Sequence, residues 1–194
     1  MAKIAPFEKH AKAYEEWFSN HSDLYAAEIQ TLKEIVQNRT NGVEIGMGSG
    51  RFALPLGITE GIEPSKAMRD IARSKGLHPI DGVAESLLYG DETFVYALMV
   101  TVICFVDDPL QALREAYRIL QHGGSLIIGI IDKDSSLGKS YVIQKDKSVF
   151  YSDTVFYSVA ETIALAKVAG FEFCTSKYVE VTENSFVFIE CHKS

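Results

Sequence analysis

This sequence of 194 residues is poor in cysteine, in net positive charge and in long apolar runs. Its three cysteines, Cys104, Cys174 and Cys191, form neither a CxxC motif nor a Cys/His cluster. Neither a disulfide framework nor a zinc site is therefore indicated. We expect three buried free thiols and no metal site, because free cysteine is among the most buried residue types.

The net charge argues against a nucleic-acid-binding protein, and the N-terminal sequence argues against a secreted protein. The formal net charge of −7 predicts no nucleic-acid partner, because binding a phosphate backbone requires a basic surface. The N-terminal segment lacks an apolar signal core, and no uncharged stretch approaches the roughly 20 residues of a membrane helix. We therefore expect a cytoplasmic protein without membrane association. With 47% hydrophobic and 23% charged residues, it fits one globular domain over residues 1–194.

Helical and strand patterns alternate along the chain. Apolar spacing predicts two helices over 7–38, broken near 19–22, and then a first strand that ends at Ile45. A turn at Glu183-Asn184 makes the last two strands an antiparallel hairpin, and residues 133–152 are either a helix or a loop. Further strands are expected at 57–62, 78–80, 93–102, 125–131 (after a turn at Gly123-Gly124), 172–182 and 186–191, and further helices at 64–74, 109–120 and 159–169. This order predicts an α/β fold with a doubly wound, mostly parallel seven-stranded sheet and a C-terminal antiparallel hairpin.

A glycine-rich turn follows the first strand. Gly46, Gly48 and Gly50 alternate there, and such a turn lets the backbone approach a nucleotide-like ligand. The second strand ends at Glu63, whose carboxylate can accept hydrogen bonds from ribose hydroxyls. Arg51 stands where the dinucleotide pattern GxGxxG requires Gly or Ala, which disfavours NAD. S-adenosylmethionine has no phosphate and needs a tight turn with a ribose carboxylate.

Several segments together resemble the class I S-adenosylmethionine-dependent methyltransferases. Residues 44–50 resemble their first motif, Glu63 their ribose-binding acid, and residues 82–87 the segment that edges the adenine. Residues 94–101 and 107–124 resemble strand four and the helix and glycine turn before strand five. The chain is most similar to the type 11 group, which is related to the ubiquinone/menaquinone-biosynthesis enzymes. This resemblance implies a Rossmann-like fold with N-terminal helices as a lid.

The resemblance also implies a division of the chain and a set of cofactor contacts. Residues 1–39 would form the helical lid, 40–132 the cofactor-binding core, and 133–194 a substrate-side segment with the hairpin. Val83 stands where many relatives carry an acid, so a contact with the adenine amino group would come from Glu85, backbone or water. The implied cofactor-binding residues are Tyr14, Trp17, Glu44, Gly46, Met47, Gly48, Gly50, Glu63, Pro64, Ser65, Met68, Gly82, Ala84, Glu85, Val100 and Thr101.

The expected activity is S-adenosylmethionine-dependent methyl transfer to a small-molecule acceptor by in-line displacement. No residue identifies a general base: His21 and Asp132 are candidates, each with a capping role as the alternative. Tyr151 and Tyr157 are candidates for the acceptor pocket. Two other readings stay open, a non-catalytic module that binds S-adenosylmethionine or S-adenosylhomocysteine, and an NAD-binding oxidoreductase. The acceptor and the oligomeric state do not follow from the sequence.

Overall fold

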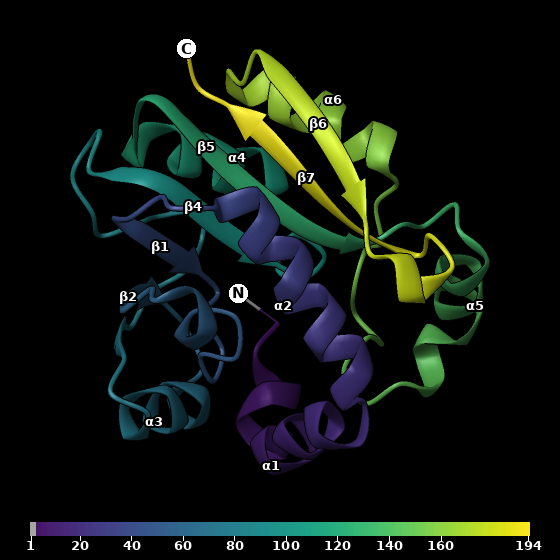
Figure 1. Ribbon diagram of the computed structural model, residues 1–194. Helices are drawn as coiled ribbons and strands as arrows, with labels where there is room; N and C mark the ends of the chain where they lie inside the picture. Colours follow the sequence, from purple (N-terminus) through teal and green to yellow (C-terminus); the bar gives the residue numbers. More distant parts are fainter. Residues whose placement is uncertain (1–2) are drawn as a thin grey trace.

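The computed structural model describes residues 3–194, so residues 1 and 2 of the predicted lid segment lie outside the described residues. A seven-stranded sheet in the order β3-β2-β1-β4-β5-β7-β6 forms the centre of the molecule (Figure 1). The strands are β1 (Gly42–Ile45), β2 (Glu60–Ile62), β3 (His78–Ile80), β4 (Phe94–Val100), β5 (Leu120–Ile131), β6 (Phe173–Tyr178) and β7 (Phe186–His192). The helices are α1 (Ala5–Asn20), α2 (Ser22–Val36), α3 (Lys66–Ser74), α4 (Pro109–Ile119), α5 (Ser136–Gln144) and α6 (Val159–Ala169), with short 3₁₀ turns at Leu54–Leu56, Lys145–Lys147 and Glu180–Thr182.

The strand directions confirm the predicted fold. β1 to β5 pair in parallel, whereas β7 runs antiparallel to both β5 and β6. Glu183 and Asn184 both adopt positive φ in the connection between β6 and β7, as a tight turn requires. The order of the strands reverses at β1 and β4, and ligands of such sheets bind at the carboxyl ends of strands near this point.

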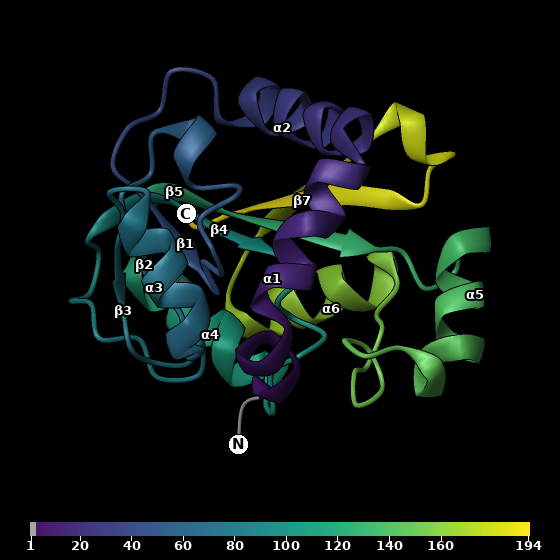
Figure 2. The same ribbon diagram turned by 90° about the horizontal axis from the view of Figure 1, so that it is seen from below.

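Both faces of the sheet are buried. Along β4, Ala97 and Met99 belong to the core under α4 and α6, whereas Leu98 and Val100 belong to the core under α2. Figure 2 shows α2 on one side of the sheet and α4 and α6 on the other. This double cover explains why β4 has a continuous apolar sequence.

Three helices begin at side-chain caps. Ser65 accepts a hydrogen bond from the Met68 amide at the start of α3, and Asp108 accepts one from the Gln111 amide at the start of α4. Ser158 forms a capping box with Glu161 at α6.

The three largest differences from the predicted strand boundaries are in β2, β6 and β5. β2 begins at Glu60 because a 3₁₀ turn occupies the preceding residues and ends at Gly57, which adopts positive φ. β6 ends at Tyr178 because another 3₁₀ turn follows. Gly123-Gly124 is no turn before β5: the strand already begins at Leu120 and passes through both glycines with a register shift opposite β4. Glycine inside a strand is typical of such irregularities.

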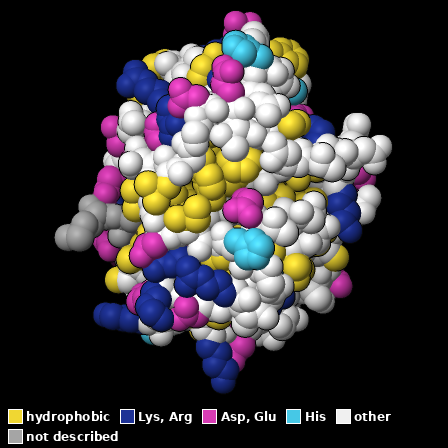
Figure 3. All heavy atoms as spheres, turned by 90° about the vertical axis from the view of Figure 1, so that its left-hand side faces the viewer, with side chains coloured by type: hydrophobic (Ala, Val, Ile, Leu, Met, Phe, Trp, Pro, Cys, Tyr) yellow, Lys and Arg dark blue, Asp and Glu magenta, His cyan; other side chains and the backbone are white. Residues whose placement is uncertain are grey.

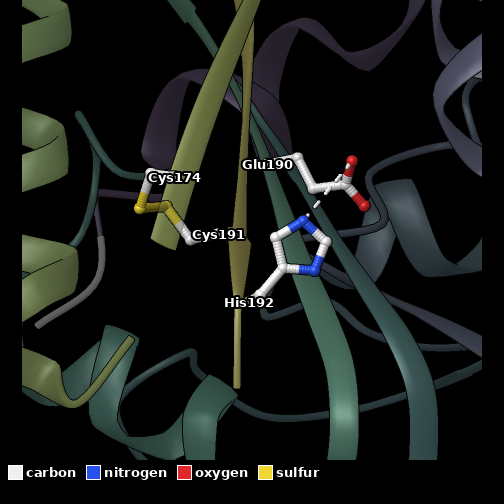
Figure 4. The surroundings of a disulfide bond; sticks show 4 residues. All are labelled: Cys174, Glu190, Cys191 and His192. Carbon is white, nitrogen blue, oxygen red and sulfur yellow. Dashed lines mark ion pairs between the residues drawn. A yellow bond between two sulfur atoms is a disulfide. The ribbon is translucent and has the colours of Figure 1, made fainter. Parts of the chain in front are cut away.

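The expectation of three free thiols is wrong for two of them. Cys174 and Cys191 lie directly opposite each other on β6 and β7 and form a disulfide (Figure 4), while Cys104 is a buried free thiol. Glu190 and His192 lie on the other side of β7, as the alternation of a strand requires. The partners are 17 residues apart in the chain and are brought together by the register of the hairpin, which no short cysteine motif records.

The surface beside β3 carries both acidic and basic side chains. Figure 3 shows this face, where acidic and basic side chains are interspersed around a small apolar area. β3 itself is a three-residue edge strand that contains Pro79, and short edges with proline pair poorly with other chains. Within residues 3–194, no helix combines the length and apolar character needed to cross a membrane.

Candidate functional site

The glycine turn between β1 and the 3₁₀ turn at Leu54–Leu56 is held against the end of β2. The amides of Gly46 and Met47 both donate to the Ile62 carbonyl, and Gly46, Gly48 and Gly50 all have positive φ. A Cβ on Gly46 would lie 2.4 Å from Val102, and one on Gly50 would lie 2.1 Å from Leu77. A Cβ on Gly48 would meet only the Tyr14 hydroxyl, at 3.8 Å. Gly46 and Gly50 are therefore needed for packing, whereas Gly48 leaves an open side of the turn.

Glu63 is oriented by two backbone amides. Its Oε2 accepts from the Gly48 amide and its Oε1 from the Ser65 amide, each at 2.7 Å. Burial raises the pKa of Glu63, and the two amides partly offset that rise. Each carboxylate oxygen can accept a further hydrogen bond. The pair of oxygens thus suits two neighbouring hydroxyls, as in a ribose.

A cavity opens in front of this carboxylate, at the carboxyl ends of β1, β2 and β4. It encloses about 670 Å³ when the solvent in its open mouth is included. Of the predicted residues, its wall contains Tyr14, Gly46, Gly48, Glu63, Pro64, Met68, Ala84, Glu85, Val100 and Thr101. Sequence reasoning missed Lys3, Ile4, Phe7, Val83, Val102, Phe105 and Val106, which also line it.

The other predicted contacts lie outside this wall. They are Glu44, Met47, Gly50, Ser65 and Gly82. Met47 packs against Gly61, and Ser65 caps α3. Trp17 lines a neighbouring cavity instead.

Glu85 lines the cavity, but its Oε1 accepts from the Asp107 and Asp108 amides. In this arrangement Oε1 braces the loop before α4, and Val83 brings no acid to the wall.

Glu44 is a buried carboxyl directly before the glycine turn. Its side chain is 1% exposed, and its Oε2 has no hydrogen-bond partner among the residues described. Burial raises the pKa of Glu44 well above its usual range, although the Ala53 amide lowers it. Buried polar atoms are almost always hydrogen-bonded, so an orphaned oxygen here suits a ligand with a positively charged donor. The acceptor oxygens of Glu44 and Glu63, with the open side of Gly48, fit the ammonium and ribose of S-adenosylmethionine.

Two carboxylates fasten α1, hereafter the lid helix, over the cavity. Glu8 Oε2 accepts from the Ser65 hydroxyl at 2.6 Å and from the Ala67 amide at 3.2 Å, at the start of α3. Glu15 accepts from the Ser49 hydroxyl and forms ion pairs with Arg51 at 2.9 Å and Lys75 at 3.1 Å. The lid helix is thereby tied both to α3 and to the glycine turn.

Thr101 lies at the end of β4, where the cavity meets its neighbours. It lines three adjoining cavities and has a φ of +54°. Positive φ is an outlier for a β-branched residue and costs roughly 1–2 kcal/mol. The Thr101 amide donates to the Gly129 carbonyl at 2.8 Å, which holds this conformation. Strained residues of this kind cluster at functional sites.

The two candidate bases serve local structure. The His21 ring hydrogen-bonds the Trp17 carbonyl at 2.8 Å and stacks on the Trp17 ring at the end of the lid helix. Asp132 Oδ1 accepts from the Asp134 amide in the turn before α5.

The two candidate acceptor-pocket residues line different cavities. Tyr151 lines the cavity that contains Trp17, whereas Tyr157 lines a small cavity beside Cys104. Within residues 3–194, no three potential metal-binding side chains (His, Cys, Asp or Glu) come together.

Comparisons with known proteins agree with this geometry. The family model described as a methyltransferase domain, type 11, matches residues 43–128. A Thermotoga maritima protein described as an S-adenosylmethionine-dependent methyltransferase, possible histamine N-methyltransferase, shares 44% identity and a TM-score of 0.92, over 98% of this chain and 100% of that one. An uncharacterised Methanocaldococcus jannaschii protein is 41% identical over 95% of this chain and 87% of its own. An uncharacterised Mycobacterium tuberculosis protein is 31% identical over 84% of this chain and 59% of its own.

The chain therefore belongs to the class I S-adenosylmethionine-dependent methyltransferases, type 11 group. It is an enzyme whose cofactor is S-adenosylmethionine, as the first motif and Glu63 indicated.

Proposed function

We propose that this enzyme transfers the methyl group of S-adenosylmethionine to a small-molecule acceptor by in-line displacement. The observation that carries the proposal is Glu63, a buried carboxylate that two backbone amides orient on the wall of the cavity. When bound, S-adenosylmethionine supplies a methyl group already activated on a sulfonium. The chain's own work is then to position the reactants and to exclude water, which is worth up to about 7–11 kcal/mol when the geometry is good.

Each side chain has a distinct part in this proposal. Glu63 accepts hydrogen bonds from the ribose hydroxyls, and Glu44 balances the charge of the ammonium behind Gly48. Met68 and Ala84 supply apolar contact to the adenine, and Thr101 lies at the end of the cavity that adjoins the acceptor side. These roles are supported by burial and by the cavity wall.

The N-terminal residues 1–39 act as the lid, 40–132 as the cofactor core and 133–194 as the acceptor side of one unit. Lid contacts from Glu8 and Glu15, and the continuity of the seven-stranded sheet across 40–194, support this division. We propose a cytoplasmic enzyme with a small-molecule acceptor and with neither a nucleic-acid nor a membrane partner. The net charge of −7 supports that proposal.

The test is calorimetry with S-adenosylmethionine, S-adenosylhomocysteine and NAD on wild type, Glu63→Ala and Glu60→Ala. Two charge-assisted hydrogen bonds are worth about 1.5–3 kcal/mol each, so Glu63→Ala weakens S-adenosylmethionine binding by roughly 10²-fold or more. Glu60→Ala is the matched control, since Glu60 begins the strand that Glu63 follows but pairs with His78 at the exposed edge. Equal affinity in Glu63→Ala and wild type would refute the ribose role.

Radiolabelled methyl transfer then separates an enzyme with a small acceptor from a non-catalytic binding module. The acceptor panel contains metabolite fractions and histamine, the compound named for the Thermotoga protein. Label in a small molecule supports the proposal. Binding of S-adenosylmethionine without label in any small molecule contradicts it, and binding of NAD in preference to S-adenosylmethionine contradicts the cofactor as well.

A further inference from the structure

A second cavity adjoins the cofactor cavity and shares part of its wall. Phe7, Tyr14, Thr101 and Phe105 line both cavities. The second one encloses about 890 Å³ when the solvent in its mouth is included. The lid helix, α2 and the segment around α5 supply most of its wall (Figure 1). A molecule there lies next to the cofactor cavity at the strained Thr101.

The wall of this cavity is aromatic. Rings of Phe7, Tyr14 and Phe150 lie within 6.2 Å of one another, and Tyr141 and Tyr151 form a further edge-to-face pair. Aromatic faces carry negative charge density and attract organic cations, which is worth about 0.5–2 kcal/mol per ring. The wall therefore suits a planar or apolar molecule, and a positive charge on it is favoured.

Glu28 is the one carboxylate on this wall among the described residues, and no Lys, Arg or His lines it there. Its side chain is 4% exposed, and within residues 3–194 it makes no hydrogen bond and no ion pair. It faces inward because Leu24, Glu28 and Leu32 follow one another at i, i+4 spacing on the same face of α2. A buried carboxyl without a partner is costly, which makes Glu28 a candidate ligand-binding group.

We propose that the aromatic cavity is the acceptor site, that it takes a small apolar or aromatic amine or imidazole, and that Glu28 binds the reacting nitrogen and receives its proton. This inference rests on the proposed methyl transfer. An anionic acceptor is disfavoured, because it would meet Glu28 without a basic residue on the wall.

The proposed step transfers one proton to Glu28 and one methyl group to nitrogen. The ammonium of the bound amine passes one proton to the Glu28 carboxylate, which frees a nitrogen lone pair. That lone pair forms the new bond to the methyl carbon, and the electron pair of the breaking carbon–sulfur bond stays on sulfur. The products are a methylated ammonium, a neutral thioether and a protonated Glu28.

Titration of Glu28 gives the proposal a second signature. Burial raises the pKa of Glu28 to about 8. The groups that share its cavity or interact with its charge are phenols, Tyr25 on its own helix, Tyr14 on the lid helix, and Tyr141 and Tyr151, all with raised pKa. A cation that pairs with Glu28 at a pH well below this pKa must therefore displace close to one proton into the buffer.

The experiment measures binding to the full chain with three probes of one shape: benzylamine, benzyl alcohol and benzoate. Trp17, the single tryptophan, lines the cavity and reports occupancy by its fluorescence. Wild type should bind benzylamine most tightly and benzoate most weakly, and calorimetry in two buffers should show proton release with benzylamine. Glu28→Gln should weaken benzylamine at least about tenfold, leave benzyl alcohol unchanged and abolish the proton release.

Glu34→Gln is the matched control, because Glu34 is an exposed carboxyl on the same helix that pairs with Lys177. Calorimetry with S-adenosylmethionine is run on every variant and separates this inference from the proposed function. If S-adenosylmethionine fails to bind wild type, the proposed function falls. If it binds wild type and Glu28→Gln equally, but benzylamine shows no preference or no dependence on Glu28, the acceptor assignment alone is overturned.

Discussion

The perturbation Glu15→Gln tests whether the lid helix is held closed by its contact with the glycine turn. Glu15 forms ion pairs with Arg51 and Lys75 and accepts a hydrogen bond from the Ser49 hydroxyl. The side chains of Glu15, Arg51 and Lys75 are each 21–26% exposed. Burial opposes ionisation, but the Ser49, Arg51 and Lys75 hydrogen bonds together lower the pKa of Glu15. The carboxylate is therefore charged at neutral pH, and both cations depend on it.

The loss of docking free energy in Glu15→Gln follows from the number and exposure of these contacts. A hydrogen bond to a charged group contributes about 1.5–3 kcal/mol when buried, and a solvent-exposed ion pair about 0.2–1 kcal/mol. With partners about one quarter exposed, and one hydrogen bond retained by glutamine, docking of the lid helix weakens by about 2 kcal/mol. The open population then rises roughly 30-fold.

Hydrogen exchange and limited proteolysis of residues 5–20 measure this population directly, because cleavage follows the open form when reclosing is fast. The affinity for S-adenosylmethionine falls by up to the same factor, since Phe7 and Tyr14 of the lid helix line its cavity. Because the folded-state pKa is lowered, the docking energy from Glu15 is present above the ordinary carboxyl pKa and is lost as pH falls through the lowered value.

Glu16→Gln is the control, because Glu16 is the exposed neighbour whose ion-pair partner among residues 3–194 is Lys12, at 3.8 Å. Unchanged exchange and unchanged proteolysis in Glu15→Gln relative to Glu16→Gln would refute this account of the lid.

Three further predictions concern strain, a buried carboxyl and the thiols. Thr101→Gly should be more stable than Thr101→Ala by about 1 kcal/mol in urea unfolding, because glycine accepts the positive φ; the opposite order would contradict the strain. Glu44→Gln should raise the unfolding free energy of the protein without cofactor, and this gain should grow as pH rises through the raised pKa of Glu44. The rise in Tm that S-adenosylmethionine causes should be smaller in this variant than in wild type. Equal stability at all pH values would argue against a buried ionisable group. Thiol titration of the unfolded, unreduced protein should find one free thiol, Cys104, and titration after reduction should find three. Three free thiols before reduction would contradict the disulfide.

Local signals predicted much of the fold. The caps Ser65, Asp108 and Ser158 are signals of this kind, because capping involves residues only three positions apart. The disulfide between Cys174 and Cys191 escaped prediction because it depends on the register of two strands.

The candidate site was predictable only in part. Motifs at the ends of β1 and β2 pointed to Gly48 and Glu63, whereas Phe7 and Phe105 reach the cavity through the docking of distant segments. Glu28 looks like an ordinary polar position of a helix, and only its place between Leu24 and Leu32 hints that it faces inward. Such assignments depend on tertiary packing, which the periodicity of one segment does not contain.

The shared wall of the two cavities has a consequence for the order and speed of turnover. Phe7 and Tyr14 belong to the lid helix and line both cavities, so neither occupant is fully enclosed until the same helix docks. By linkage, an occupant of one cavity that favours the docked helix tightens binding in the other, and the factor is the same in both directions. If the spent cofactor and the product leave only when this helix undocks, one opening event would limit kcat whatever the chemistry of the methyl group.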